Sequence, residues 1–130
     1  MLDTDRARLD ERYLSALSTR EFGTLRSIFA PHIRFRALVP GGLREANGVE
    51  ETIAMIEGWY RGCDTVDVVA SSISHAADRA GIAYRLRVHE NGRWYIIGQD
   101  VFYALEAGKI AAMDLLCSGF RPEENRLDSN

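Results

Sequence analysis

The chain has 130 residues, a length that suits one domain with a single hydrophobic core. A hydrophobic content of 46% and a charged content of 27% are ordinary for a globular protein. The net charge of −3 gives no basic surplus for a nucleic-acid partner, and no apolar run is long enough to span a membrane. Because the charged N-terminus also lacks the apolar stretch of a signal peptide, we expect a cytoplasmic protein.

The first half of the sequence predicts three helices and one strand. Apolar residues recur at helical spacing over residues 4–18, with Asp10 on the polar side of that helix. A short second helix ends at Pro31, and a third helix runs from about residue 49 to 61. Between the second and third helices, residues 32–38 alternate between apolar and polar side chains, which is typical of a strand.

The second half predicts an antiparallel meander. Four strand-like segments are separated by short turns that contain glycine, near residues 66–77, 81–90, 93–105 and 109–118. Helices followed by a meander indicate an α+β fold, a cone-shaped curved antiparallel sheet covered by three N-terminal helices, as in a cystatin-like α+β barrel. The open end of such a cone forms a pocket. We expect a single domain over residues 1–122 and a flexible tail over residues 123–130.

Asp100 stands out because it interrupts an apolar strand. Alternation places it on the same face as Trp94, Ile96 and Phe102, and places Gln99 on the other face. We expect the face that carries Asp100 to point into the core, where an unpaired carboxylate is costly and the neutral acid is favoured. A neutral acid in an apolar cavity can donate a hydrogen bond to a developing oxyanion.

The order of the predicted elements resembles a known family. Together with segments 12–17, 29–31 and 100–110, it resembles the nuclear-transport-factor-2-like superfamily, especially the SnoaL-like polyketide cyclases and the ketosteroid isomerases. The resemblance covers residues 9–120. It implies that Tyr13 stands where the isomerases have their oxyanion-hole tyrosine. It also implies that Asp100 stands where they have a protonated aspartic acid.

The leading hypothesis is cofactor-independent isomerisation, cyclisation or dehydration of a small hydrophobic carbonyl compound, such as a polyketide or steroid. Tyr13 and Asp100 would polarise the carbonyl group. The positions at which the resembling enzymes carry a catalytic carboxylate hold Ala37 and Leu115, so Glu45, near the expected mouth of the cone, is the candidate base. Further residues are expected to line the pocket and contact the substrate: Phe35, Ile56, Tyr84, Leu86, Val88, Trp94, Phe102, Met113, Leu115 and Cys117.

Two alternatives stay open, namely a binding domain that uses the same pocket without catalysis and an interaction domain with a filled core. The histidines and cysteines lack metal-ligand spacing, so we expect neither a metal nor a cofactor, and His89 is expected to be exposed. Gln99, Val101 and Tyr103 are expected on the uncovered face of the sheet, where they are too apolar for free solvent. We therefore expect a homodimer that forms through this face.

Overall fold

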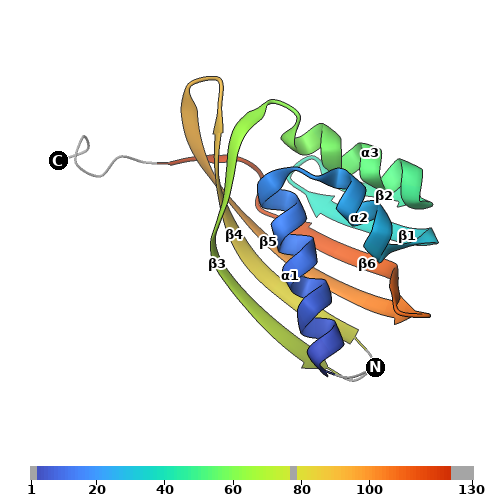
Figure 1. Ribbon diagram of the computed structural model, residues 1–130. Helices are drawn as coiled ribbons and strands as arrows, with labels where there is room; N and C mark the ends of the chain where they lie inside the picture. The colour runs from blue at the N-terminus through green and yellow to red at the C-terminus, as the bar shows by residue number, and fades with distance from the viewer. Residues whose placement is uncertain (1–2, 77–78, 124–130) are drawn as a thin grey trace.

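The computed structural model describes residues 3–76 and 79–123, and the side chains of residues 8–74 and 79–123. Within these ranges the chain forms three helices that cover one face of a curved, seven-stranded sheet (Figure 1). The helices are α1 (Asp3–Thr19), α2 (Phe22–Ile28) and α3 (Val49–Tyr60). The strands are β1 (Phe29–Val39), β2 (Gly42–Asn47), β3 (Cys63–Ala76), β4 (Arg79–Glu90), β5 (Arg93–Glu106), β6 (Lys109–Cys117) and β7 (Arg121–Pro122). The predicted α+β cone is confirmed.

The sheet is mixed, whereas the sequence predicted an antiparallel one. Its strand order is β2-β1-β6-β5-β4-β3, and β7 pairs with β5. β1 and β6 are neighbours in the sheet and run parallel. In the sequence they are separated by β2, α3 and three further strands. β2 and β7 were not predicted, since β2 buries only Ala46 and β7 is two residues long.

Helix α1 lies on the sheet with the apolar stripe that the sequence predicted. Its residues Leu9, Tyr13, Ala16 and Leu17 are buried in the main core. Asp10, predicted on the polar side of this helix, is also buried. No helix among the described residues has both the length and the apolar character needed to cross a bilayer.

The hairpin between β4 and β5 decides which residues face the helices. Asn91 and Gly92 both have positive φ angles, 51° and 75°, as a two-residue type I′ turn requires. This turn pairs Tyr84 with Gln99, and cross-strand partners share a face of the sheet. Tyr84 points towards the helices, and Gln99 therefore does so too.

The alternation predicted for β5 is right, but the predicted inner face is wrong. The residues that face the helices are Ile97, Gln99, Val101 and Tyr103, all of which are buried. Trp94, Ile96, Asp100 and Phe102 have the opposite parity and lie on the uncovered side of the sheet. We call the helix-covered side the inner face and the uncovered side the outer face.

The predicted tail, residues 123–130, lies outside the described residues except for Glu123. The Glu123 amide donates a hydrogen bond to the Trp94 carbonyl oxygen over 2.9 Å, and its carboxylate accepts two hydrogen bonds from Arg87. Glu123, the first residue of the predicted tail, is therefore tied to β4 and β5.

Candidate functional site

Three tyrosines and a glutamine meet on the inner face. Tyr13 comes from α1, Tyr60 is the last residue of α3, and Tyr84 and Gln99 lie opposite each other on β4 and β5. Cys117, at the end of β6, borders the same group. None of the four larger side chains is more than 4% exposed. We call these five residues the tyrosine–glutamine cluster.

A chain of hydrogen bonds runs through the cluster. The Tyr84 hydroxyl donates to Oε1 of Gln99 over 2.5 Å, so its proton is committed there. The hydroxyls of Tyr13 and Tyr84 are 2.7 Å apart, and Tyr13 must therefore be the donor in that contact. At the other end, Nε2 of Gln99 donates to the Cys117 sulfur over 3.3 Å.

The direction of this chain is reversible. Hydroxyls and thiols can both donate and accept, and the Gln99 amide can exchange its two ends by rotation. With the amide rotated, its NH₂ group would donate to Tyr84, and Tyr84 would donate to Tyr13. The Tyr13 proton would then be free to bind an oxygen atom of a ligand.

Burial keeps the cluster uncharged. Desolvation raises the pKa of the Tyr13 hydroxyl, and the hydrogen bond with Tyr84 opposes this only in part. Desolvation likewise raises the pKa values of Tyr84 and Tyr60 well above that of a free phenol. All three hydroxyls are therefore neutral hydrogen-bonding groups throughout the physiological pH range.

A buried carboxylate lies one helical turn from Tyr13. Asp10 is fully buried, and its Oδ1 accepts a hydrogen bond from the Tyr103 hydroxyl over 2.5 Å. This pair was not predicted from the sequence, because Asp10 was expected on the polar side of the helix and Tyr103 on the outer face. The spacing contained the signal, since Asp10 lies three residues before Tyr13 and seven before Leu17, on one face of the helix.

Two of the three predicted catalytic residues lie outside the interior. Tyr13 is inside, as predicted. Asp100 is exposed on the outer face and does not lie in the apolar cavity in which it was expected. Glu45 is exposed on β2 opposite Arg36, another outward residue, because β2 extends the sheet instead of forming a loop at the mouth.

The predicted pocket-lining residues fall into two groups. Most of them are buried on the inner side or in the helix above it, namely Phe35, Ile56, Tyr84, Leu86, Val88, Met113 and Leu115. Cys117 is half-buried beside Gln99. Trp94 and Phe102 belong to the outer face, and Phe102 is 45% exposed. Their placement was wrong for the same reason as that of Asp100, while the roles of the buried residues stay predictions.

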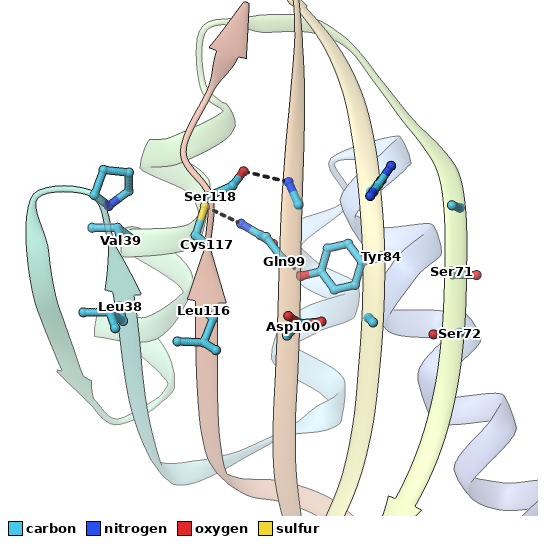
Figure 2. Close-up of a pocket in the computed structure, with 15 residues that line it drawn as sticks. Leu38, Val39, Ser71, Ser72, Tyr84, Gln99, Asp100, Leu116, Cys117 and Ser118 are labelled. Atoms are coloured by element: carbon cyan, nitrogen blue, oxygen red, sulfur yellow. Dashed lines mark hydrogen bonds between the residues drawn. The ribbon is translucent and has the colours of Figure 1, made fainter.

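The outer face holds a hollow of about 750 Å³ (Figure 2). One row of side chains crosses the sheet here through cross-strand pairs: Leu43, Leu38, Leu116, Asp100, Ala83 and Ser72. The small residues Ala70, Ala83 and Gly98 leave the bottom of the hollow free of large side chains. Arg85 and Asp100 both line the hollow. The hollow lies directly behind the strand segments that carry Tyr84 and Gln99 inside.

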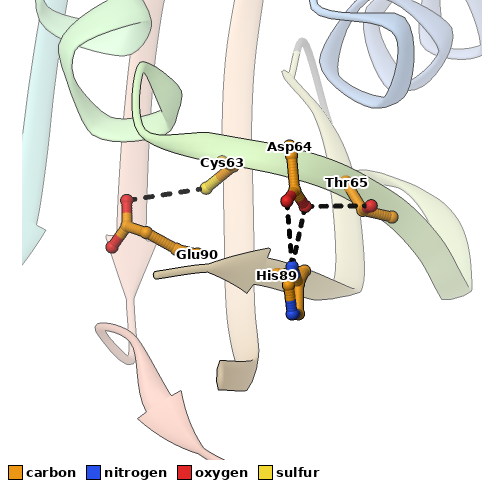
Figure 3. Close-up of polar contacts among 5 residues, drawn as sticks. All are labelled: Cys63, Asp64, Thr65, His89 and Glu90. Carbon is orange, nitrogen blue, oxygen red and sulfur yellow. Dashed lines mark hydrogen bonds and ion pairs between the residues drawn. The ribbon is translucent and has the colours of Figure 1, made fainter. Parts of the chain in front are cut away.

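Polar residues at the start of β3 form a separate group (Figure 3). The register between β3 and β4 shifts at Asp64, and the Asp64 carboxylate lies 2.8 Å and 3.0 Å from Nδ1 of His89. The hydrogen bond with His89 lowers the pKa of Asp64. His89 is thus partly buried, whereas it was predicted to be exposed.

Cys63 does not complete a catalytic dyad with His89. Its thiol contacts Glu90 at 3.9 Å, and burial raises the pKa of this thiol to about 11. A thiol with such a pKa is protonated and weakly nucleophilic at neutral pH. Among the side chains that the structure describes, no group of three or more His, Cys, Asp or Glu residues is arranged to hold a metal ion.

The fold is a nuclear-transport-factor-2-like cone, and the tyrosine–glutamine cluster places polar groups inside it. The chain matches the family model of the SnoaL-like domain over residues 11–113, and it belongs to that family. No curated protein matches the chain at the sequence level.

Solved structures with the same fold carry several descriptions. A putative SnoaL-like polyketide cyclase from Shewanella denitrificans has a TM-score of 0.73 at 12% identity, covering 90% of this chain and 92% of its own. A protein with a ketosteroid isomerase-like fold from Catenulispora acidiphila, in complex with trimethylamine, has a TM-score of 0.72 at 14% identity and covers 85% of each chain. An LEH-like epoxide hydrolase from M. tuberculosis has a TM-score of 0.69 at 13% identity, covering 88% and 84%. These likenesses show the fold.

Proposed function

We propose that the interior of the cone binds a small, uncharged and largely apolar molecule that carries a carbonyl or hydroxyl oxygen. The observation that supports this is the buried hydrogen-bond chain of Tyr13, Tyr84 and Gln99. Apart from this chain and Asp10, the inner face and the buried helix stripes are almost entirely apolar. An apolar lining with a few placed polar groups that fix one oxygen is the usual composition of a small-molecule site.

Matched ligands test this proposal. Naphthalene, 2-naphthol and 2-acetylnaphthalene share an apolar body, and only the last two carry oxygen. Removal of the Tyr13 hydroxyl in Tyr13→Phe should weaken the two oxygenated ligands about three- to tenfold, the equivalent of one hydrogen bond. Calorimetry or fluorescence titration measures the dissociation constants.

The control for this experiment is Tyr95→Phe, which removes the hydroxyl of a half-buried tyrosine that takes no part in the chain of hydrogen bonds. Tyr95→Phe should leave the affinities for all three ligands unchanged. Tyr13→Phe should leave the affinity for naphthalene unchanged. If none of the three ligands binds, or if Tyr13→Phe weakens naphthalene as much as 2-naphthol, the interior is not a site of this kind.

A second candidate function is acid–base catalysis on such a ligand. The buried Asp10 carboxylate favours this function, because a general base has to lie inside the cone. Ala37 and Leu115 carry no carboxylate, and Glu45 is exposed outside the cone. In this scheme Tyr13 donates to the carbonyl oxygen, and the Asp10 carboxylate accepts a proton from an acidic carbon of the same molecule. Deuterium uptake by a bound conjugated ketone in D₂O, followed by NMR, should then be lost in Asp10→Asn.

We also propose that a second copy of the chain covers the outer face. Four large apolar side chains are about half exposed there: Leu38, Leu43, Phe102 and Leu116. Asp100 and Arg85 border the same hollow with opposite charges. We place the two-fold axis of this dimer at the hollow, so that Asp100 of each copy can pair with Arg85 of the other.

A further inference from the structure

The hollow on the outer face has an apolar end and a polar end (Figure 2). Leu38, Pro40 and Leu116 line it over β1 and β6, and both leucines are about half exposed. Arg85 and Asp100 line it over β4 and β5. Small-molecule sites usually measure about 300–1,000 Å³, and this hollow measures about 750 Å³. It therefore has the size and the mixed lining of a binding site.

Two opposite charges lie next to each other at the polar end. Ala83 pairs with Asp100 and Arg85 pairs with Gly98, so Arg85 and Asp100 are diagonal neighbours on the outer face. Diagonal neighbours on two strands stand about 7–8 Å apart. Both side chains are exposed, so one small ligand can contact the two of them at once.

Neither of these two charges has a partner. Arg79 and Arg87, the neighbouring outward arginines of β4, each form a salt bridge with a carboxylate, at 3.2 Å and 2.8 Å. No ion pair or side-chain hydrogen bond joins Arg85 or Asp100 to any other residue that the structure describes. The hollow thus presents one unpaired cation and one unpaired anion beside an apolar wall.

We propose that this hollow binds a free amino acid with an aliphatic or aromatic side chain. The carboxylate of the amino acid pairs with the Arg85 guanidinium, and its ammonium group pairs with the Asp100 carboxylate. Its side chain lies against Leu38 and Leu116. A ligand that carries only one of the two charges leaves either Arg85 or Asp100 unpaired and binds more weakly.

The amino acid and a second copy of the chain use the same two charges. In the proposed dimer, Asp100 of each copy pairs with Arg85 of the other, so a bound amino acid takes the place of both pairs. Because the ligand then binds the monomer in preference to the dimer, it shifts the equilibrium towards the monomer. This effect rests on the proposed dimer, whereas the binding of the amino acid does not.

Four ligands test the site in NMR titrations at protein concentrations that keep the chain monomeric. L-phenylalanine carries both charges and an apolar group, phenethylamine lacks the carboxylate, 3-phenylpropionate lacks the amine, and glycine lacks the apolar group. L-phenylalanine should bind about three- to fivefold more tightly than each of the other three. The amide signals that shift should centre on Ala83 and Gly98, at the bottom of the hollow.

Two variants assign the charges. Arg85→Gln should weaken L-phenylalanine about three- to fivefold without weakening phenethylamine, and Asp100→Asn should weaken L-phenylalanine without weakening 3-phenylpropionate. The control is Arg93→Gln, which removes an exposed arginine at the start of β5 that does not line the hollow. This variant should leave the affinities for all four ligands unchanged.

Three results overturn the site. The first is that L-phenylalanine binds no more tightly than phenethylamine and 3-phenylpropionate. The second is that Arg85→Gln weakens phenethylamine as much as L-phenylalanine. The third is that the shifted signals centre on the tyrosine–glutamine cluster, which places the amino acid in the interior.

Sedimentation experiments then test the competition with the second copy. At ten times its dissociation constant, L-phenylalanine should raise the dissociation constant of the dimer about 100-fold, since both copies have to release the ligand before they associate. A dimer that L-phenylalanine leaves intact overturns the competition. If the parent protein is monomeric without ligand, the proposed dimer fails, and the titrations still decide whether the hollow binds an amino acid.

Discussion

The position of each hydroxyl in the buried chain predicts how much it contributes to stability. Tyr84→Phe removes the middle hydroxyl and leaves both Oε1 of Gln99 and the Tyr13 hydroxyl without this partner. A buried polar group that loses its partner costs about 1–3 kcal/mol, so the two together predict a loss of about 2–6 kcal/mol. Tyr13→Phe removes only the end of the chain, and Tyr84 keeps its bond to Gln99. We therefore expect a loss of about 1 kcal/mol for this variant.

Urea unfolding followed by circular dichroism measures both losses. With a slope of about 2 kcal/mol per molar urea, the midpoint should fall by about 1–3 M for Tyr84→Phe and by about 0.5 M for Tyr13→Phe. The double variant should cost little more than Tyr84→Phe alone, since the second change removes a hydroxyl that has already lost its acceptor. Tyr95→Phe is the matched control. Equal losses for the two single variants, or losses that add in the double variant, would refute a chain with Tyr84 in its middle.

Three further predictions follow from single contacts. If a second copy covers the outer face, Asp100→Arg and Arg85→Asp should each weaken dimerisation in sedimentation experiments, and their combination should restore it; a monomeric parent contradicts the proposal. Hydrogen bonding to Arg36 lowers the pKa of Asp114, so the stability that this carboxylate contributes is present above its ordinary pKa near 4 and is lost as the pH falls towards the folded-state value. Asp114→Asn should therefore flatten the acid limb of a stability–pH curve, and an unchanged limb excludes this contribution. Gly119→Ala should destabilise the protein by about 1 kcal/mol or more, because the added Cβ meets the Pro40 ring at a positive φ; a neutral effect in urea unfolding contradicts this.

The fold was predictable because its strongest signals are local. The apolar stripe of α1, the helix at residues 49–60 and the glycine-containing turns each reflect a repeat or a turn within a few residues. The parallel pairing of β1 with β6 and the addition of β2 depend on segments that are distant in sequence or mostly polar, so alternation gives no signal for them.

The candidate site was predictable only in part, because β5 has apolar residues on both faces. Alternation alone cannot decide whether Asp100 or Gln99 points inward. The Asn91–Gly92 turn contains the missing information, since a two-residue turn places Tyr84 opposite Gln99. The arginines at positions 85 and 87 mark the outward side of β4 and therefore also the outward side of β5. Combined, these two signals identify the buried chain of hydroxyls from sequence.

The separation of the two polar groups inside the cone predicts which carbon atom of a ligand could lose a proton. Along β5, Tyr103 lies four residues beyond Gln99, or about 13 Å at 3.3 Å per residue. Tyr13 is linked to the Gln99 end of this segment through Tyr84, and Asp10 is linked to the Tyr103 end. This separation along β5 suits an extended conjugated ketone better than a compact one.

The conjugated ketone β-ionone tests this geometry, because it has an acetyl methyl group next to the carbonyl and a ring methyl group at the far end of its conjugated system. Loss of a proton from the acetyl methyl group gives a cross-conjugated enolate, and loss from the ring methyl group gives an extended enolate in which both double bonds have shifted. If Asp10 is the proton acceptor, deuterium from D₂O should enter the ring methyl group in preference to the acetyl methyl group, and Asp10→Asn should abolish this uptake. Tyr13→Phe should slow it about tenfold or more, because the developing oxyanion loses its hydrogen bond. Uptake confined to the acetyl methyl group, or uptake that Asp10→Asn does not alter, excludes Asp10 as the base and leaves binding as the function of the interior.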